Sequence, residues 1–354
     1  MARFLKSFVS FLRKFCRRRP RINALESSSL GQLPVELILH ITRFLDPASA
    51  ASFSLCCRQI SLIIGTQYLK ALQHEDRQSE LYEFLTLLEP GLPDQVLCYY
   101  CKKFHAIKHA WRHTYKNLSY YSSTSRQPPK CWSVTRKSWA SSYISGNFSW
   151  TVFQMAMKRY RQGRDYTRLL DLLSYHATTS WKPGHVRQTT TLLRIVNGSL
   201  LVREQRVFLP FQGDECWSAC PHHAGSHFWK YLRDSMIHWD KLESREAGLM
   251  HCEYCLTEFR LDFKAFEKEG VAMVFTKWQN LGRGLFPWDL EWCSHIYKPE
   301  ARLMEALWER VYFERGSISD AFEEGKDFEF ASSLTSSWRK EWLRRSYVGR
   351  FCVT

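Results

Sequence analysis

The chain has 354 residues, of which 45% are hydrophobic and 15% aromatic, so it is too apolar for a disordered protein. It is long enough for a small module followed by one sizeable domain. Its formal net charge of +15 would suit a nucleic-acid-binding protein, but eight of these charges lie in residues 1–22 and seven remain over the other 332 residues. The body of the protein is therefore only mildly basic, and no surface that follows a phosphate backbone is expected.

The 12 cysteines lack the dense, regular spacing of a secreted disulfide scaffold. No signal peptide of the usual form precedes them, and no apolar run reaches the roughly 18–20 residues that span a bilayer. We therefore expect a cytoplasmic or nuclear protein that is not secreted, whose cysteines are thiols or metal ligands.

Residues 1–26 form a tail of their own. Six apolar residues recur there at helical spacing among eight Lys and Arg residues, with no acidic residue before Glu26. A basic amphipathic helix of this kind binds an anionic membrane or serves as a targeting peptide. A solvated, disordered tail is the alternative. Membrane contact by residues 1–22 thus remains one of two interpretations.

The most specific pattern lies in residues 31–65. Pro34 suits the first turn of a helix, and Asp46-Pro47 ends that helix and begins a second, with Asp46 as the N-cap. A third helical turn ends at Gly65. The first helix should turn one apolar stripe toward a core: Leu37, Ile38, Ile41, Phe44 and Leu45.

Three short helices cannot bury both apolar faces of the first one. The spare face, which carries Val35 and Leu39, must contact either the rest of this chain or a partner. From periodicity alone, packing within the protein's own core is the default use of such a stripe.

The motif LPxELxxxIxxxLDP, followed by Leu55, Cys57-Arg58 and Ile60, resembles the F-box. This resemblance implies a trihelical module, here residues 27–72, that docks on a Skp-type adaptor and through it on a cullin-based ubiquitin ligase. Many members carry a Trp shortly after the Cys-Arg pair, where this chain has Ile and Leu. The family's contact residues correspond here to Leu33, Pro34, Leu37, Ile41, Leu45, Leu55 and Cys57.

Residues 73–354 are expected to form one mixed domain. Residues 66–89 and two segments around Gly163 have helical patterns, and so do residues 226–243. From Thr190 the period changes to two, and Asn197-Gly198 predicts a β-hairpin. Two further strands are expected near residues 251–263 and 271–282. The predicted fold class is α+β: a trihelical F-box followed by a helix and antiparallel-sheet domain that zinc would stabilise.

Three Cys/His clusters have the spacing of metal ligands. Two are C-x-x-C pairs, whose turn directs both sulfur atoms at one point and suits Zn²⁺. Buried free thiols are the alternative. Our preferred ligand set is Cys220, His222, Cys252 and Cys255, and a second or competing site would use Cys98, Cys101 and His105.

Residues 95–300 also resemble uncharacterised filamentous-fungal F-box proteins. The shared features are the order of the Cys/His clusters, the hairpin RIVNGSLLV and the segment TKWQNLGRG…PWDLEW. This resemblance implies no activity or substrate.

Two classes of function remain after these observations. The first is a non-catalytic substrate receptor of an SCF-type ubiquitin ligase, with a Skp-type adaptor, a cullin and an unknown protein substrate as partners. The alternative is a zinc-stabilised interaction or nucleic-acid-binding protein that acts outside a ligase. A Cys/His enzyme is disfavoured because no nucleophile motif accompanies the clusters.

Overall fold

The computed structural model describes residues 28–114, 131, 143–182, 185–209, 218–223, 248–266, 270–296 and 310–324. The chain divides into two compact units, residues 1–105 and residues 106–354. The predicted tail of residues 1–26 and the predicted helix of residues 226–243 lie outside the described residues. Among the helices that are described, none has the length and apolar content that crossing a bilayer requires.

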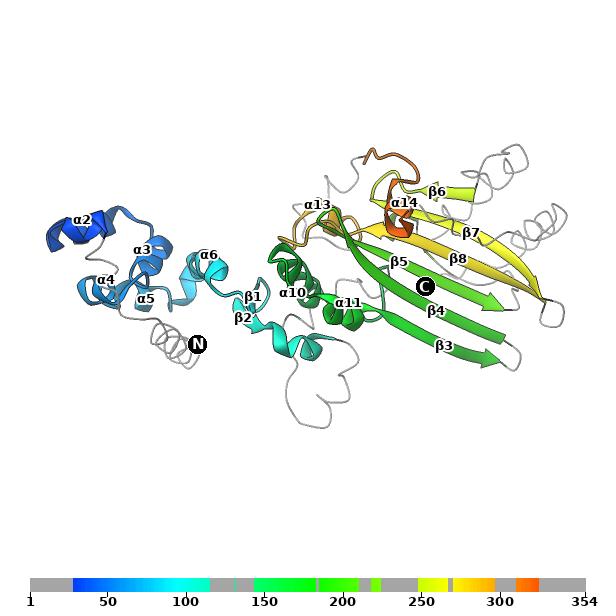
Figure 1. The fold of residues 1–354 in the computed structure, drawn as a ribbon, viewed down its shortest axis with the longest axis horizontal. Helices are drawn as coiled ribbons and strands as arrows, with labels where there is room; N and C mark the ends of the chain where they lie inside the picture. The colour runs from blue at the N-terminus through cyan, green and yellow to red at the C-terminus, as the bar shows by residue number, and fades with distance from the viewer. Residues whose placement is uncertain are drawn as a thin grey trace. The chain divides into compact units, whose positions relative to one another are not determined.

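The first unit begins with the three predicted helices (Figure 1). Asp46 lies between the first two, and its carboxylate accepts hydrogen bonds from Ala48 N at 3.0 Å and Ser49 N at 2.9 Å. A hydrogen bond with the Ser49 side chain, together with these backbone bonds, holds the pKa of Asp46 below its usual value. The predicted N-cap is therefore confirmed, as are three helical elements: α2 (Val35–Phe44), α3 (Pro47–Phe53) and α4 (Arg58–Ile64), preceded by the 3₁₀ turn η1 (Ser29–Gln32).

The later elements of this unit pack against α3, the second of the three helices. Ala48 and Ala51 of α3 pack against Leu81 and Phe84 of the following helical segment, and their small side chains allow the close approach. That segment and the small sheet after it consist of α5 (Gln67–Ala71), η2 (Glu75–Arg77), α6 (Gln78–Leu88), η3 (Glu89–Gly91), β1 (Gln95–Cys98) and β2 (Lys103–Ala106).

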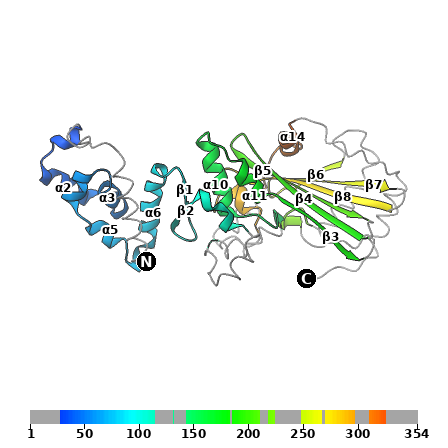
Figure 2. The same ribbon diagram turned by 60° about the horizontal axis from the view of Figure 1, so that its bottom comes forward.

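The second unit is built on a six-stranded antiparallel sheet whose order is β3-β4-β5-β8-β7-β6 (Figure 2). It consists of two meanders that meet where β5 pairs with β8. The strands are β3 (Tyr175–Lys182), β4 (His185–Val196), β5 (Ser199–Leu209), β6 (Leu249–His251), β7 (Thr257–Phe266) and β8 (Gly270–Asn280).

The predicted hairpin is confirmed as β4 and β5. Val196 pairs with Ser199, and the two residues between them have positive φ, 50° at Asn197 and 78° at Gly198. This is the backbone that a two-residue hairpin turn requires. The strand predicted near residues 271–282 is present as β8, and the one predicted near residues 251–263 is present only in its second half, as β7, because a turn separates β7 from the short strand β6.

The sequence interpretation missed β3 and the first residues of β4. These stretches are rich in Thr, Ser and His and show little hydrophobic alternation, because β3 lies at the edge of the sheet. His176 lies opposite Thr190, and its Nδ1 is 3.0 Å from the threonine hydroxyl. Polar cross-strand pairs therefore replace apolar ones at this edge.

The two helical segments predicted around Gly163 are α10 (Trp150–Arg161) and α11 (Thr167–Leu173). The first nine residues of α10 are buried. Trp150 and Phe153 contact Trp292, with ring centroids 4.7 and 6.3 Å away, respectively. This aromatic cluster fixes α10 against the segment after β8, which contains the short helix α13 (Leu290–Cys293). A 3₁₀ segment, η4 (Ile107–His113), precedes α10 in this unit.

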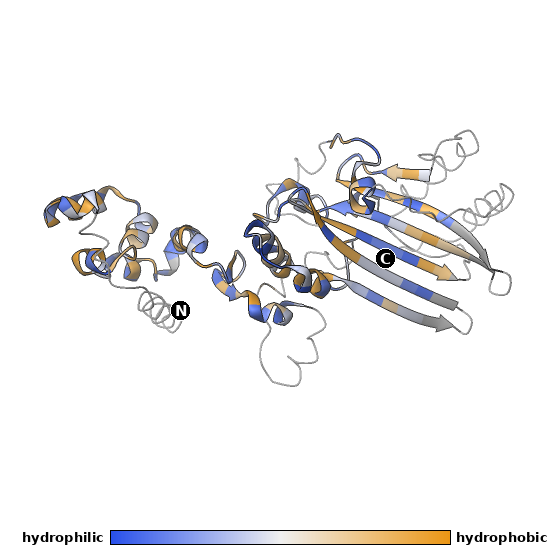
Figure 3. Ribbon diagram, viewed as in Figure 1, coloured by the Kyte–Doolittle hydropathy of each residue, from blue (hydrophilic) through white to orange (hydrophobic). Residues whose placement is uncertain are grey.

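An ion pair is buried between β5 and β8, and a second cation contacts its carboxylate. Glu204 and Lys277 are direct cross-strand partners, 3% and 0% exposed, with Lys277 Nζ 2.7 Å from Glu204 Oε2. Arg206 Nε lies 2.8 Å from the other carboxylate oxygen. Burial alone would raise the pKa of Glu204, but the two cations outweigh it and lower that pKa. Hydrophilic bands accordingly run through the strands in Figure 3.

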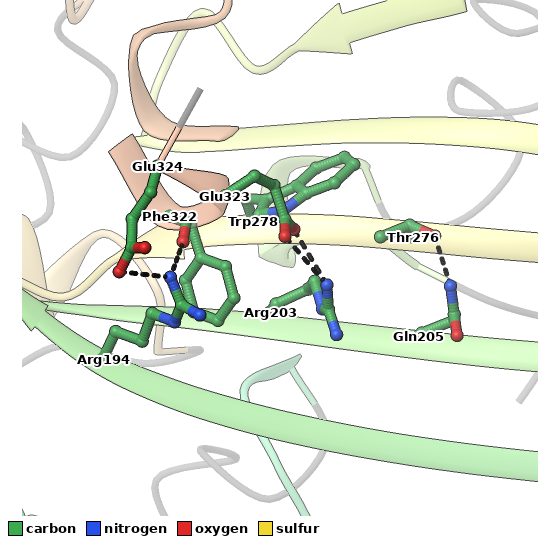
Figure 4. Close-up of polar contacts among 8 residues, drawn as sticks. All are labelled: Arg194, Arg203, Gln205, Thr276, Trp278, Phe322, Glu323 and Glu324. Atoms are coloured by element: carbon green, nitrogen blue, oxygen red, sulfur yellow. Dashed lines mark hydrogen bonds and ion pairs between the residues drawn. The ribbon is translucent and has the colours of Figure 1, made fainter. Parts of the chain in front are cut away.

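The opposite face of the sheet is clamped by α14 (Ser317–Glu323), which is the last described helix. In Figure 4, Arg203 donates to both carboxylate oxygens of Glu323 at 3.0 Å, and Trp278 Nε1 donates to the same carboxylate at 2.9 Å. On β7, buried Glu258 accepts hydrogen bonds from the backbone N–H groups of Gly316 and Ser319. Arg194 on β4 also donates to Phe322 O at 2.7 Å, so polar contacts on four strands fix the segment of residues 310–324.

Gly284 supplies a test of the packing around α10. Its φ is +60°, and a Cβ there would lie 2.7 Å from the buried Phe153 ring. Gly284→Ala should lower the free energy of unfolding by about 2–4 kcal/mol, because a left-handed conformation and an overpacked ring act together. Gly163→Ala is the matched control, since its φ is +63° and no atom lies within 4 Å. Chemical denaturation should show the larger loss for Gly284→Ala; equal losses would contradict this packing.

Candidate functional site

Helix α2 presents an apolar face to solvent. Phe44 is 78% exposed, and Val35, Leu37 and Ile41 on the same helix are also exposed. Leu62 on α4 adds a further exposed side chain, at 74%. Helices this short gain most of their stability from burying such residues, so an uncovered apolar face indicates a contact with a partner.

The predicted core-facing stripe of α2 is wrong for three of its five residues. Leu37, Ile41 and Phe44 are exposed, whereas Ile38 is buried together with Thr42. The hydroxyl of Thr42 donates to Ile38 O at 2.8 Å, so this polar residue is satisfied within the helix and can face the core. Hydrophobicity alone predicts the stripe. Because Thr42 is buried with Ile38, the side of α2 that packs against the core lies away from the predicted stripe.

The seven residues that the F-box resemblance assigns to adaptor contact occupy two kinds of position. Pro34, Leu37 and Ile41 are exposed. The other four, Leu33, Leu45, Leu55 and Cys57, are half-buried. Leu33 and Cys57 pack against the buried cluster of Ile38, Ile60 and Ile64, and Leu55 packs against the cluster that contains Ala48 and Ala51 of α3. Cys57 also accepts a hydrogen bond from Ile60 N and so caps α4. Leu33, Leu55 and Cys57 therefore also hold the helices together.

The residues that the F-box resemblance assigns to the adaptor do not include Val35, Phe44 and Leu62, which also belong to this exposed apolar surface. The available signal was the helical spacing of Leu37, Ile41 and Phe44, which places them on one side of α2. A stripe of apolar residues is usually buried, so this spacing by itself predicts a face that packs against the core.

The second unit brings together the preferred metal-ligand set. Cys220, His222, Cys252 and Cys255 each offer one ligand atom, and these atoms all lie within 4.8 Å of one another. Cys252 Sγ is 3.7 Å from His222 Nδ1. Ligand bonds of about 2.0–2.3 Å in a tetrahedron place neighbouring ligand atoms roughly 3.3–3.8 Å apart, so this spacing suits Zn²⁺.

Two segments supply these four side chains. The turn between β6 and β7 carries Cys252 and Cys255, and backbone bonds at its base, Cys252 N to Thr257 O at 2.9 Å and Thr257 N to Cys255 O at 2.7 Å, close it tightly. Tyr254 N donates to Cys252 Sγ at 3.3 Å. The short 3₁₀ turn η6 (Pro221–His223) carries His222 and follows Cys220 directly.

The side chains of this cluster could hold a cation. All three cysteines are 0% exposed. Burial raises the pKa of the Cys255 thiol well above its usual value, and hydrogen bonds with Cys220 and Cys252 raise it further. Three buried thiolates would repel one another, so a bound cation is what would allow them to ionise together. Three sulfurs and one imidazole match the ligand preference of zinc.

The first unit holds a separate cluster. Ligand atoms of Cys98, Cys101 and His105 also lie within 4.8 Å of one another. Cys101 N donates to Cys98 Sγ at 3.4 Å, and Lys102 N donates to Cys98 O at 2.8 Å. Lys102 has a φ of 48°, which closes a tight turn between β1 and β2. Within the first unit, these three residues therefore form a group of possible metal ligands of their own.

A buried histidine, His295, lies near the Cys220 group. His295 is 0% exposed, and burial lowers its pKa to about 4, so its ring is neutral. Its Nε2 lies 2.9 Å from Asn280 O. Its Nδ1 lies 3.4 Å from the hydroxyl of Thr257 and 3.3 Å from Gln279 Nε2. The sequence does not predict a role for His295, Thr257 or Gln279 at this site, because their spacing is not that of metal ligands.

Residues 30–72 match the F-box domain, so the helices that expose the apolar face are those of an F-box. F-box proteins are generally non-catalytic subunits that bind Skp-type adaptors in SCF ubiquitin ligases. No curated protein and no solved structure matches the chain. The resemblance of residues 95–300 to filamentous-fungal F-box proteins therefore stays a prediction.

If the Cys220 group holds one zinc ion, Cys252→Ser should remove that ion and lower the melting temperature of the second unit. Structural zinc contributes on the order of 10 kcal/mol in small domains, so the loss should be large. Elemental analysis of purified protein and a thermal melt would measure both effects. Exposed Cys56 supplies the control, and Cys56→Ser should change neither quantity. Unchanged zinc content in Cys252→Ser would assign these cysteines to the core alone.

Proposed function

We propose that this chain is the substrate receptor of an SCF-type ubiquitin ligase. Its F-box would dock on a Skp-type adaptor and so reach a cullin, and its C-terminal domain would hold a protein substrate. The observation that carries this proposal is the exposed apolar face of α2 within the segment that matches the F-box.

The exposure of individual residues supports a direct docking contact. Leu37 and Ile41 are among the residues that the F-box resemblance assigns to the adaptor, and both are exposed. Phe44 and Leu62 extend the same kind of surface. A few large apolar side chains that become fully desolvated usually supply most of the binding energy of an interface. We therefore infer that these four side chains contribute most of the affinity.

We also infer that the C-terminal domain holds structural Zn²⁺ on Cys220, His222, Cys252 and Cys255. Four protein ligands leave no open position for a substrate, so the ion would have a structural role and not a catalytic one. It would join the turn before β7 to a segment about 30 residues earlier, and closing such a loop by ligand bonds stabilises the domain. Cys98, Cys101 and His105 are candidates for a second ion.

The alternative is a zinc-stabilised interaction protein that works outside a ligase. The buried Cys/His cluster favours it equally, because a zinc-stabilised domain serves either role. Nucleic-acid binding receives less support, since eight of the excess positive charges lie in residues 1–22. A substrate receptor must bind a Skp-type adaptor, and a protein that works outside a ligase need not, so a measurement of adaptor binding distinguishes the two functions.

Substitution of Leu37 tests the docking contact. Leu37→Glu places a charge in the centre of the proposed interface and should weaken adaptor binding at least about tenfold, measured by titration with a purified Skp-type adaptor. Because Leu37 is 47% exposed, the melting temperature should not change.

The matched control is Leu87→Glu on α6, in the same unit but outside the F-box match. Leu87 is 54% exposed, so the two substitutions make the same chemical change at similar exposure. Leu87→Glu should bind the adaptor normally. Normal binding by Leu37→Glu would rule out this face as the docking surface.

A further inference from the structure

We propose that the Thr257 hydroxyl is a positioning group for the metal site, which donates its hydrogen bond to the Cys255 sulfur when metal is bound. This inference rests on the proposed zinc site. It concerns a side chain that is not itself a ligand and that carries no ligand signature in the sequence.

The distances define a short chain of polar groups. Thr257 is 0% exposed, and its Oγ1 lies 3.1 Å from Cys255 Sγ and 3.4 Å from His295 Nδ1. A threonine hydroxyl has one proton, so it can donate to only one of these two atoms at a time. The direction of the chain therefore depends on which atom needs a donor more.

The tautomer of His295 is fixed at the far end of the chain. His295 Nε2 is 2.9 Å from Asn280 O, and a carbonyl only accepts, so Nε2 carries the ring proton. Nδ1 is then an acceptor. Gln279 Nε2, 3.3 Å away, can donate to it. The Thr257 proton is therefore not required by the histidine.

Whether Cys255 is a thiol or a metal-bound thiolate decides which atom receives the Thr257 proton. As a thiol, Cys255 can donate its own proton to Thr257 Oγ1, and the threonine proton is then directed to His295. As a metal-bound thiolate, the sulfur has no proton to donate and is a strong acceptor. Thr257 then donates to the sulfur, while Gln279 alone satisfies Nδ1. Metal loading would thus assign the Thr257 proton to the sulfur.

Hydrogen bonds to ligand atoms tune a metal site, and removing such a partner typically lowers metal affinity about 10–100-fold. Thr257→Val keeps the shape of the side chain and removes only the hydroxyl. It should lower the zinc affinity of the full chain by that factor, measured by competition with a chelator. Thr257→Ser keeps the hydroxyl and should restore the affinity.

Cobalt(II) gives a signature that a purely structural effect would not change. A thiolate without its hydrogen bond gives up electron density more easily, so the sulfur-to-cobalt charge-transfer band of Thr257→Val should move to longer wavelength. Any cobalt bound by the Cys98 cluster contributes equally to both proteins and cancels in the difference spectrum. Gln279→Met should shift the band in the same direction, because Thr257 must then also serve His295. In a Thr257→Val background it should add nothing.

Thr276→Val is the matched control. Thr276 is also 0% exposed, on the neighbouring strand β8, but its hydroxyl accepts a hydrogen bond from Gln205 on the other face of the sheet (Figure 4). It should leave the affinity and the band unchanged. If Thr257→Val behaves like wild type, or if Thr276→Val matches its loss, the inference fails while the zinc site stands. If the wild-type chain takes up no cobalt or zinc, both fail.

Discussion

The pairing of β5 with β8 is the constraint on which the second unit depends. These strands are separated by about 60 residues of sequence, and their ladder joins the β3-β4-β5 meander to the β8-β7-β6 meander. On one face the ladder buries Glu204 beside Lys277, and on the other it places Arg203 and Trp278 under α14. Breaking one partner of a buried ion pair leaves an uncompensated charge, so a shift of register by one residue would be strongly destabilising. The buried pair thus specifies the register that places β7, and with it the two cysteines of the turn before it.

The local patterns of the sequence predicted most of the elements. The Asp46 cap, the Asn197-Gly198 turn and the helices around Gly163 all follow from short-range chemistry, and the structure contains each of them. Convergence of Cys220 with Cys252 could be proposed because ligand spacing and residue type restrict the choices. What could not be predicted depends on tertiary contacts: which face of α2 is buried, the polar edge strand β3 and the role of Glu258 as the acceptor for α14. A sequence pattern gives periodicity but does not show which partner covers each face.

The two units use apolar residues in opposite ways. In the F-box, small helices bury few large side chains and leave Phe44 and Leu62 in solvent. In the second unit, Trp150, Trp278 and Trp292 are each at most 2% exposed. At these three positions, the high aromatic content of the chain is thus part of the interior. Exposed aliphatic and aromatic residues of α2 are the better guide to a partner.

The buried ions on β5 and β8 have a consequence for the electrical state of the domain. Lys277, Arg206 and Glu204 together carry one positive charge, and Lys277 interacts electrostatically with Cys220. A divalent ion held by three thiolates and a neutral imidazole carries one negative charge. With zinc bound, the negative charge of this site would offset the positive charge of the Glu204, Lys277 and Arg206 group, whereas three protonated thiols would not. Opposite charges attract more strongly in a medium of low polarity, so the ion group on β5 and β8 would stabilise the proposed metal-bound form.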